Sequence, residues 1–480
     1  MTASGTIAGF LIRLASNAFF ARQMTPEEFG VWGFAAVWAT LASLPYAMSL
    51  PTAMLQLDRG VRHLFGTVRT LTLRLVAGVL VTSALAAFII GGTQGASVAW
   101  CFLGLILGQA FSAIGYVHDA ALQRAMRYDV VAATRLAGVA GGLLVAVPFA
   151  LATPGPLVLV LRDSLPPVLS LGLAMVYLRR HRRDPDLALE GGYDPATARA
   201  VRSLGAGLLG NRLVEALVNR LDSLLVGFAF GERALGSFDQ ARYLAGLPNA
   251  VTGTFTHSVA LRTFAAVRDE PARLARALSL LQWLTARVTL AGTCLCLVVP
   301  ELLVELLFGA GWGLSAEMLR TFAPWLALVP LVVNQQVFLT ALGSLAPVRR
   351  SLLLGALALP LGIGVALPLE DAAWTPLGNT LGYLAMFIAL IVTPEAQLPG
   401  AARRRELLRC FLPPFAGVGA SALSAFTVRM TVAGGGSRSE EAIVGAVALA
   451  AYVGTLFLLE GRAVIAELHY LVASATKRTR

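Results

Sequence analysis

The sequence has few charged residues and few cysteines for its length. Only 14% of its 480 residues are charged, whereas soluble domains carry about 25%, so the composition excludes a soluble globular protein. The four cysteines lie in or beside apolar runs at spacings that suit no metal site. We therefore expect neither a disulfide framework nor a cysteine-bound metal, and we expect no cofactor.

Long polar segments are also missing. The longest polar segment is 179–203, and the loop near 300–320 is itself half apolar. No segment offers room for a catalytic domain outside a membrane, and no nucleophile and base stand in a catalytic arrangement. These absences argue against an enzyme.

Apolar runs fill most of the remaining chain. Hydrophobic residues make up 57% of the sequence, and the mean hydropathy is +0.72. Because a membrane-spanning helix needs about 20 mostly apolar residues, these runs predict an all-α integral membrane protein with about 14 transmembrane helices. The candidate ranges are 4–22, 29–50, 71–91, 97–117, 135–153, 157–178, 204–230, 236–260, 277–299, 321–343, 351–369, 374–393, 410–429 and 441–460.

The basic residues, all arginine except Lys477, provide an independent check of this topology. Numbering the loops alternately places 27 of the 38 basic residues on one side and five on the other, with six inside the spans. By the positive-inside rule the rich side and both termini face the cytoplasm. The net charge of +11 therefore reflects topology and contact with membrane lipids, and it predicts no nucleic-acid partner. This topology places four histidines at the cytoplasmic surface: His63, His118, His181 and His469.

Two segments form a faint internal repeat. EEFGVWGFAAVWATLASLP (27–45) follows the first span, and RALGSFDQARYLAGLP (233–248) follows the seventh, with Gly30 matching Gly236. Both copies enter from the same side, so the repeat is parallel. Duplicated halves of this kind are typical of transporters, with the substrate site between the halves.

The polar segment 179–203 separates the two copies. It predicts two pseudo-symmetric six-helix lobes followed by two extra C-terminal helices and a cytoplasmic tail. We expect the N-terminal lobe at 1–183, the C-terminal lobe at 184–400, and the extra helices with the tail at 401–480.

Three segments carry recognisable motifs: ARQMTPEEFGVW (21–32), NRLDSLLVGFAFGERALGSFDQARYLAGLP (219–248) and LLFGAGW (306–312). Their sequence and spacing resemble those of bacterial polysaccharide (O-unit) flippases, a family of the multidrug/oligosaccharidyl-lipid/polysaccharide (MOP) exporter superfamily. Phe238 stands where this family often has Tyr. The resemblance covers about 1–345, and beyond it only the span count and the loop charge agree.

The resemblance implies two six-helix lobes around a cationic cavity in the bacterial cytoplasmic (inner) membrane. It implies alternating-access flipping of a polyprenyl-pyrophosphate-linked oligosaccharide from the cytoplasmic to the outer leaflet, for O-antigen, lipopolysaccharide or another surface polysaccharide. The implied partners are this lipid-linked oligosaccharide, a coupling ion and polysaccharide-assembly proteins. The two extra helices are similar to those of the fourteen-helix lipid II flippase, in which they line a groove for the lipid tail.

Charged residues interrupt the predicted seventh span. Arg212, Glu215, Arg220 and Asp222 stand where apolar side chains are expected, and a charge near the bilayer centre costs at least about 2.5–3.5 kcal/mol. Such residues usually face a protein interior or a watery pathway. On a helical wheel Arg220 lies to the side of a polar stripe. With residues of other spans, this stripe forms the predicted substrate-binding site: Arg13, Asn17, Arg212, Glu215, Asn219, Asp222, Asp239, Arg242 and Arg287.

These residue types suit an anionic, sugar-bearing cargo. A guanidinium group binds pyrophosphate as a planar fork, and carboxylates or amides bind sugar hydroxyls or exchange a coupling ion. Arg13 and Arg287 have no evident partner in the sequence. Six arginines inside the spans face four acids, which leaves a surplus of two positive charges; the acids are Asp163, Glu215, Asp222 and Asp239.

Mutual neutralisation is the structural alternative for the same charges. Arg212 and Glu215 are three residues apart on one helix and can pair. Asp222 and Arg242 lie on neighbouring predicted helices. Arg162 lies near the end of its span, where its side chain can snorkel to the interface.

A lipid-linked oligosaccharide flippase is the leading hypothesis. The alternative within transporters is a drug/cation antiporter of the same superfamily, which predicts a cavity dominated by acids. A third hypothesis, from another class, is a membrane scaffold of a polysaccharide-synthesis complex that transports nothing itself.

Overall fold

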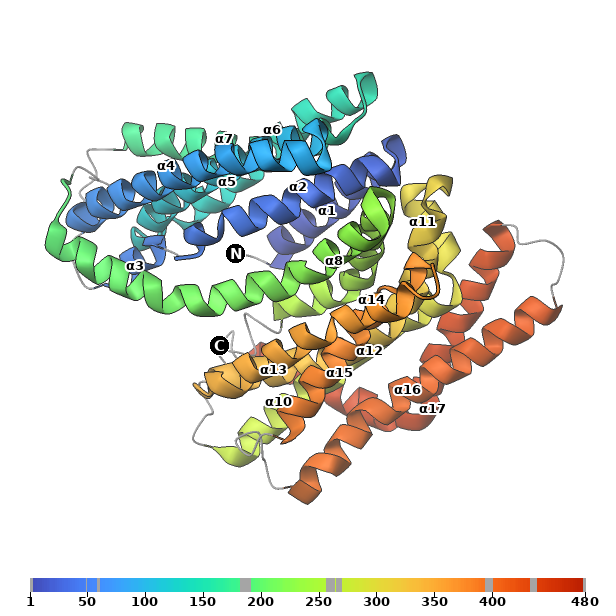
Figure 1. The fold of residues 1–480 in the computed structure, drawn as a ribbon. Coiled ribbons are helices and arrows are strands. Elements are labelled where there is room, and N and C mark those ends of the chain that lie inside the picture. Colours follow the sequence, from blue (N-terminus) through green and yellow to red (C-terminus); the bar gives the residue numbers. More distant parts are fainter. Residues whose placement is uncertain are drawn as a thin grey trace. The chain divides into compact units, whose positions relative to one another are not determined.

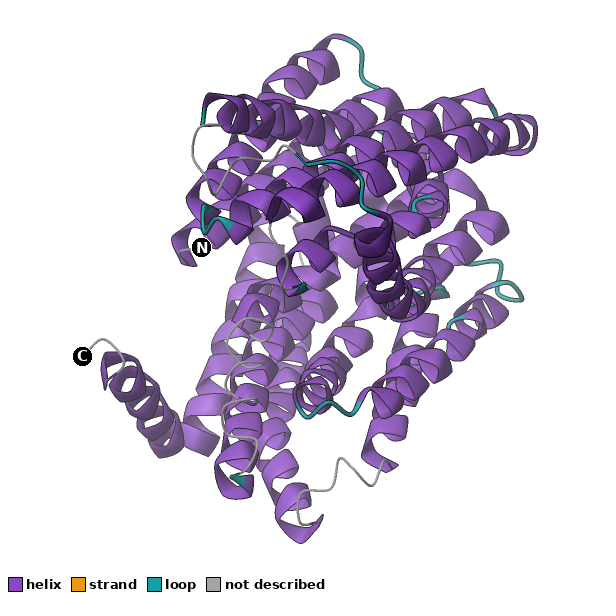
Figure 2. Cartoon of the chain, turned by 90° about the vertical axis from the view of Figure 1, so that its left-hand side faces the viewer, coloured by secondary structure: helices purple, strands orange, loops and turns teal. Residues whose placement is uncertain are grey.

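The computed structural model describes most of the chain. It covers residues 3–48, 50–57, 61–181, 191–255, 264, 270–392, 400–431 and 438–477. Throughout these ranges the regular secondary structure is helical, and Figure 2 shows no strand among them. The prediction of an all-α membrane protein is confirmed.

The chain divides into two compact units. The first contains Met1–Ser237 and Leu307–Gly311, and the second contains Phe238–Leu306 and Trp312–Arg480. The predicted lobes at 1–183 and 184–400 and the extra segment at 401–480 follow the repeat rather than compactness, and they stay a prediction.

The first unit is a bundle of long helices. A capping box begins its second helix, because Thr25 accepts a hydrogen bond from Glu28 N (3.3 Å) while the Glu28 carboxylate accepts one from Thr25 N (2.8 Å). Its helices are α1 (Ala3–Gln23), α2 (Pro26–Ala42), η1 (Leu44–Met48), α3 (Leu50–Gln56), α4 (Val61–Gln94), α5 (Ala96–Arg124), α6 (Tyr128–Ala152), α7 (Pro156–Arg180) and the first part of α8 (Pro195–Phe255).

Small polar side chains tie these helices together. Helix α5 packs against α4 and α7, and α7 packs against α6 (Figure 1). Ser164 of α7 donates to the Gly104 carbonyl of α5 (2.9 Å), and Ser170 of α7 donates to the Thr134 carbonyl of α6 (2.9 Å). Hydrogen bonds of this kind link helices where no water competes for the partner.

The remaining helices belong mostly to the second unit. In its interior Asn334 of α12 donates to the Thr285 hydroxyl of α10 (2.7 Å), and Ser421 of α16 donates to the Ala448 carbonyl of α17 (2.7 Å). The helices are α10 (Pro271–Val298), α11 (Pro300–Phe308), η4 (Ala310–Trp312), α12 (Gly313–Ala341), α13 (Leu345–Ala358), α14 (Pro360–Ala366), η5 (Ala372–Trp374), α15 (Leu377–Val392), α16 (Gly400–Thr431) and α17 (Arg438–Lys477).

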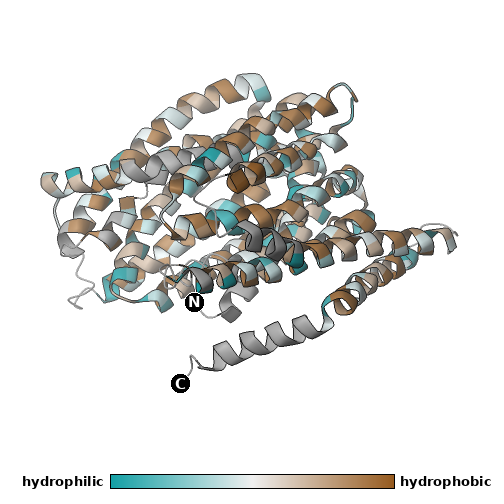
Figure 3. Ribbon diagram, turned by 90° about the horizontal axis from the view of Figure 1, so that it is seen from below, coloured by the Kyte–Doolittle hydropathy of each residue, from teal (hydrophilic) through white to brown (hydrophobic). Residues whose placement is uncertain are grey.

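Ten helices are long and apolar enough to cross a membrane, and the bent pair formed by α2 and the segment after it adds an eleventh if it is one span. Each of the fourteen predicted ranges coincides largely with helix within the described residues. Large apolar side chains stand on the outer faces of these helices, for example Phe88 and Leu458, which are 86% and 88% exposed. Apolar residues run along the helices in Figure 3. Such surfaces fit contact with lipid tails rather than water.

A break at Gly231 divides α8. Gly231 has φ 82° and ψ −175°, a backbone conformation that is essentially restricted to glycine. The break falls between the predicted spans 204–230 and 236–260, as the sequence indicates.

The two repeat copies cross each other next to this break. A Cβ atom added at Gly30 would overlap the carbonyl of Glu232, and one added at Gly236 would overlap the carbonyl of Pro26. In the repeat alignment Pro26 corresponds to Glu232, so each glycine meets the residue equivalent to the one its counterpart meets. Such reciprocity is the mark of a two-fold-related contact. We call the contact of Pro26 and Gly30 with Glu232 and Gly236 the glycine crossing.

Candidate substrate site

Arg162 lies inside the first unit and does not snorkel to the interface. Its Nε donates to Asp163 Oδ1 (2.8 Å), and its Nη1 lies 3.4 Å from Asn17 Oδ1 on α1. The guanidinium stands over the rings of Phe20 and Trp32, at 5.5 and 5.3 Å from the ring centres. The snorkelling alternative is therefore wrong, because an adjacent carboxylate and two aromatic rings hold the charge within the bundle.

Arg13 has a different environment, although it is one turn from Asn17 on the same helix. Its side chain is exposed, and its Nε donates to the Gly9 carbonyl of its own helix (3.3 Å). Within the described residues no ion pair joins Arg13 to a carboxylate. The side chain is thus available to water or to a ligand.

The polar stripe of α8 is described only in part. The side chains of Arg212, Glu215 and Asn219 lie outside the described residues, so their predicted roles stay predictions. Asp222 is buried, and its Oδ1 accepts a hydrogen bond from Ser223 N (2.7 Å). Burial of this carboxylate agrees with an inward-facing stripe.

Asp239 and Arg242 form an ion pair on α8. Arg242 Nη2 lies 3.0 Å from Asp239 Oδ1, and the two side chains are 22% and 13% exposed, respectively. The guanidinium also stands 5.6 Å from the centre of the Phe238 ring. The sequence alternative paired Arg242 with Asp222, whereas the recorded ion pair joins it to Asp239, one turn earlier.

Arg287 has a partner that the sequence did not reveal. It forms an ion pair with Glu460 of α17, with an Nε–Oε2 distance of 3.1 Å, and the two side chains are only 11% and 7% exposed. Its Nη1 donates to the Trp283 carbonyl (2.6 Å), and Tyr452 donates to the Arg287 carbonyl (2.9 Å). The expectation of an unpartnered Arg287 is wrong, because α17 continues past the predicted end of its span and brings Glu460 back to α10.

Glu460 also changes the charge balance inside the helices. Counting it with the four acids identified in the sequence gives five acids against six arginines. The predicted surplus of two positive charges becomes a surplus of one.

Two further corrections concern α5 and α6. His118 is buried, not at the surface, because α5 continues past the predicted span to Arg124; its Nδ1 lies 2.9 Å from the Ile114 carbonyl. Arg135 belongs to helix α6 and pairs with Asp119 of α5 (2.7 Å). That ion pair lies at the edge of a cavity that no sequence pattern indicated, because its polar residues are scattered over several helices.

Residues 19–317 match the profile of a family described as "Polysaccharide biosynthesis protein". The chain belongs to this family. The match covers more than half of the chain and includes all three motifs on which the resemblance rests. No curated protein sequence matches this polysaccharide biosynthesis protein.

Solved structures show which fold it has. The lipid II flippase MurJ in an inward closed conformation aligns with a TM-score of 0.72 at 11% identity, over 96% of this chain and 99% of that one. An inward-facing multidrug resistance MATE family transporter of the MOP superfamily aligns with a TM-score of 0.62 at 15% identity, over 85% and 94%. A MOP superfamily transporter from Pyrococcus furiosus aligns at 0.51 with 13% identity, over 84% and 93%. The chain has the fold of this superfamily.

Proposed function

We propose that this protein flips a polyprenyl-pyrophosphate-linked oligosaccharide from the cytoplasmic to the outer leaflet of the bacterial inner membrane by alternating access. Both termini face the cytoplasm, and the cargo serves surface polysaccharide synthesis. Membership of a polysaccharide biosynthesis family and the fold of MOP transporters support this proposal. The protein then moves its cargo without a catalytic step, and a coupling ion or assembly proteins act with it.

The environment of Arg13 carries the proposal. Arg162, Arg242 and Arg287 are each paired with a carboxylate, so their charge is largely compensated. Arg13 is exposed and has no recorded carboxylate partner within the described residues. A guanidinium placed in a membrane helix without a counter-ion needs an anionic ligand or water, and a pyrophosphate provides two such anionic groups.

The test is flipping in reconstituted vesicles. A polyprenyl-pyrophosphate sugar with a fluorophore on its head group is incorporated with purified protein, and a membrane-impermeant reductant bleaches the outward-facing molecules. Wild type is expected to expose the whole lipid pool. Arg13→Ala is expected to slow exposure by roughly 10- to 140-fold, the effect of losing one hydrogen bond to a charged group.

Two further variants make this result specific. Arg13→Lys keeps the positive charge and is expected to retain part of the activity, although it loses the planar fork. Arg320→Ala removes an exposed arginine whose partner is Glu301 (2.7 Å), outside the predicted site, and is expected to flip at the wild-type rate. Arg13→Ala flipping at the wild-type rate would remove the basis of the cationic site.

The same vesicles separate the alternatives. A scaffold without transport leaves half of the labelled lipid protected even with wild-type protein. A drug/cation antiporter accumulates a cationic dye against an imposed proton or sodium gradient and leaves the lipid unflipped. Either result would overturn the proposal.

A further inference from the structure

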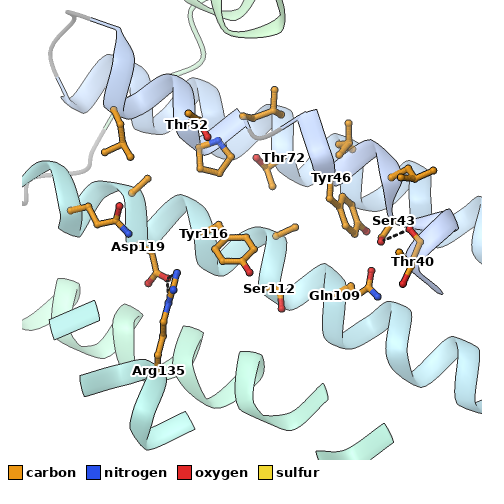
Figure 4. Close-up of a pocket in the computed structure, with 18 residues that line it drawn as sticks. Thr40, Ser43, Tyr46, Thr52, Thr72, Gln109, Ser112, Tyr116, Asp119 and Arg135 are labelled. Atoms are coloured by element: carbon orange, nitrogen blue, oxygen red, sulfur yellow. Dashed lines mark hydrogen bonds and ion pairs between the residues drawn. The ribbon is translucent and has the colours of Figure 1, made fainter. Parts of the chain in front are cut away.

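A cavity lies within the first unit, away from the predicted arginine site. Its volume is about 640 Å³, within the ~300–1,000 Å³ that is usual for small-molecule sites. The end of α2, η1, α3, α4, α5 and α6 supply its walls. Figure 4 shows Tyr46, Thr52 and Thr72 on one side, facing Gln109, Ser112 and Tyr116 on the other. We call it the hydroxyl cavity.

The walls of this cavity are held in place by hydrogen bonds to α3. Arg124 at the end of α5 donates to the carbonyls of Met54 and Leu57, the latter at 3.0 Å. These bonds join the segment around α3 to α5. The cavity is therefore a built feature of the bundle rather than a gap beside a loose loop.

The charged groups at the edge of the cavity neutralise each other. Arg135 Nε and Nη2 both donate to Asp119 Oδ2, at 2.9 and 2.7 Å. The guanidinium also stands 5.6 Å from the centre of the Tyr116 ring. An anion would have to displace Asp119, and a cation would have to displace Arg135, so the cavity favours a neutral ligand.

Several polar groups of the cavity lack partners inside the protein. The hydroxyls of Tyr46 and Thr72 are shielded from water and have no hydrogen-bond partner in the described structure. No side-chain hydrogen bond is recorded for Gln109 or Ser112 within the described residues, although both line the space. An unpaired polar group in a low-dielectric site is unfavourable unless a ligand or water supplies a partner.

Apolar and aromatic surface completes the lining. Leu50, Leu55 and Leu75 lie between the polar groups, and Tyr116 presents a ring as well as a hydroxyl. A sugar ring has the matching surface, with hydroxyls around its edge and C–H groups on its faces, whereas an acyl chain would leave the hydroxyls and the amide unpaired.

We propose that the hydroxyl cavity binds a neutral sugar unit of the cargo. This inference rests on the proposed function, because the proposed cargo carries sugars. The cavity lies toward the ends of α4, α5 and α6 that carry the basic loops, which are the predicted cytoplasmic ends. Sugar binding there holds the head group on the loading side before the pyrophosphate reaches the arginines.

The experiment measures sugar binding by the purified full-length protein. Methyl β-glucopyranoside and methyl N-acetyl-β-glucosaminide are titrated in detergent, and binding is detected by saturation transfer from protein to sugar protons. Wild type is expected to bind at least one glycoside, and inorganic pyrophosphate is expected not to displace it. Gln109→Met with Ser112→Ala is expected to weaken binding by roughly 5- to 140-fold, the effect of two lost hydrogen bonds.

The controls exclude a folding effect. Gln109 and Ser112 have no recorded internal hydrogen bond, so the double variant is expected to keep the wild-type melting temperature. Ser83→Ala removes another buried, unpartnered hydroxyl, on α4 but outside the cavity lining, and is expected to bind sugar normally. No binding by wild type, unchanged binding by the double variant, or displacement by pyrophosphate would each overturn the inference.

The vesicle assay keeps this inference separate from the proposed function. Lipid flipping by a protein that binds no glycoside overturns the sugar site alone. Glycoside binding at the cavity by a protein that flips no lipid overturns the proposed function alone.

Discussion

Replacing Gly30 by alanine is expected to separate α2 from α8 at the glycine crossing. A Cβ at Gly30 would overlap the Glu232 carbonyl and lie 2.8 Å from the Glu232 Cα, and a Cβ at Gly236 would lie 2.8 Å from Gly30 N. Ordinary contact begins at 3.4 Å, so the backbones must part by at least the difference of 0.6 Å. Both obstacles are backbone atoms, which cannot rotate away as a side chain does.

The expected magnitude follows from the packing of this contact. Forcing an extra carbon into a well-packed site costs about 1–3 kcal/mol. Applied to the closed crossing alone, this range raises the population of the open arrangement by roughly 5- to 140-fold. The same free energy lowers the melting temperature if the crossing has no open alternative.

Thiol labelling measures the open population. Ser237 follows Gly236 and is only 1% exposed, so a cysteine there reacts with a water-soluble maleimide only when the crossing opens. The four native cysteines are first replaced, although all are buried. Gly30→Ala is expected to raise the labelling rate of Ser237→Cys by the factor given above. Gly246→Ala, on the same helix with open space around its Cβ, is the matched control and is expected to label at the parent rate.

Reciprocity gives the sharper form of this test. Gly236→Ala is expected to act as strongly as Gly30→Ala, because each methyl group meets the equivalent carbonyl. The double variant is expected to exceed either single variant by less than their sum, since one separation relieves both overlaps. The reasoning is refuted if Gly30→Ala labels at the parent rate and melts at the parent temperature.

Three other predictions concern α8 and α17. Burial and the nearby charge of Glu27 raise the pKa of Glu232 above its ordinary value, so this arrangement is favoured at low pH and weakens as pH rises through the raised pKa; Glu232→Gln is expected to flatten the pH dependence of the melting temperature. Gly231→Ala is expected to destabilise the protein by roughly 1–3 kcal/mol in thermal unfolding because of its backbone conformation, and an unchanged melting temperature would contradict the break at this residue. Arg287→Met is expected to cost roughly 3–5 kcal/mol because it leaves Glu460 buried and unpaired, with Arg287→Met/Glu460→Leu recovering much of the loss; equal melting temperatures for the single and double variants would show that the ion pair is not formed.

Local features of the fold were predictable from the sequence. Apolar runs of span length and the break before Gly236 depend only on neighbouring residues, and both agree with the structure. Helix ends were less predictable: α4 begins ten residues before its predicted range and α5 ends seven residues after it. Polar residues at a helix end read as loop in the sequence, although they extend the helix beyond the bilayer. The misplacement of His118 has this cause.

Contacts between distant segments were not predictable. Arg287 and Glu460 are 173 residues apart, and no periodicity links α10 to the last helix. The repeat did match Gly30 with Gly236, but equivalence in an alignment does not imply contact. Only the backbone geometry shows that each glycine lies against the counterpart of the other's neighbour.

The ion pairs rank the predicted arginines as ligands for pyrophosphate. Arg287 is held by Glu460, by the Trp283 carbonyl and by the Trp283 ring, 3.9 Å from its guanidinium carbon, so binding an anion there would strand a buried carboxylate. Arg242 has a more exposed carboxylate partner one turn away, which can turn to water while the guanidinium changes ligand. Arg13 needs no exchange at all. The expected order of contribution to binding is therefore Arg13, then Arg242, with Arg287 serving to anchor α17.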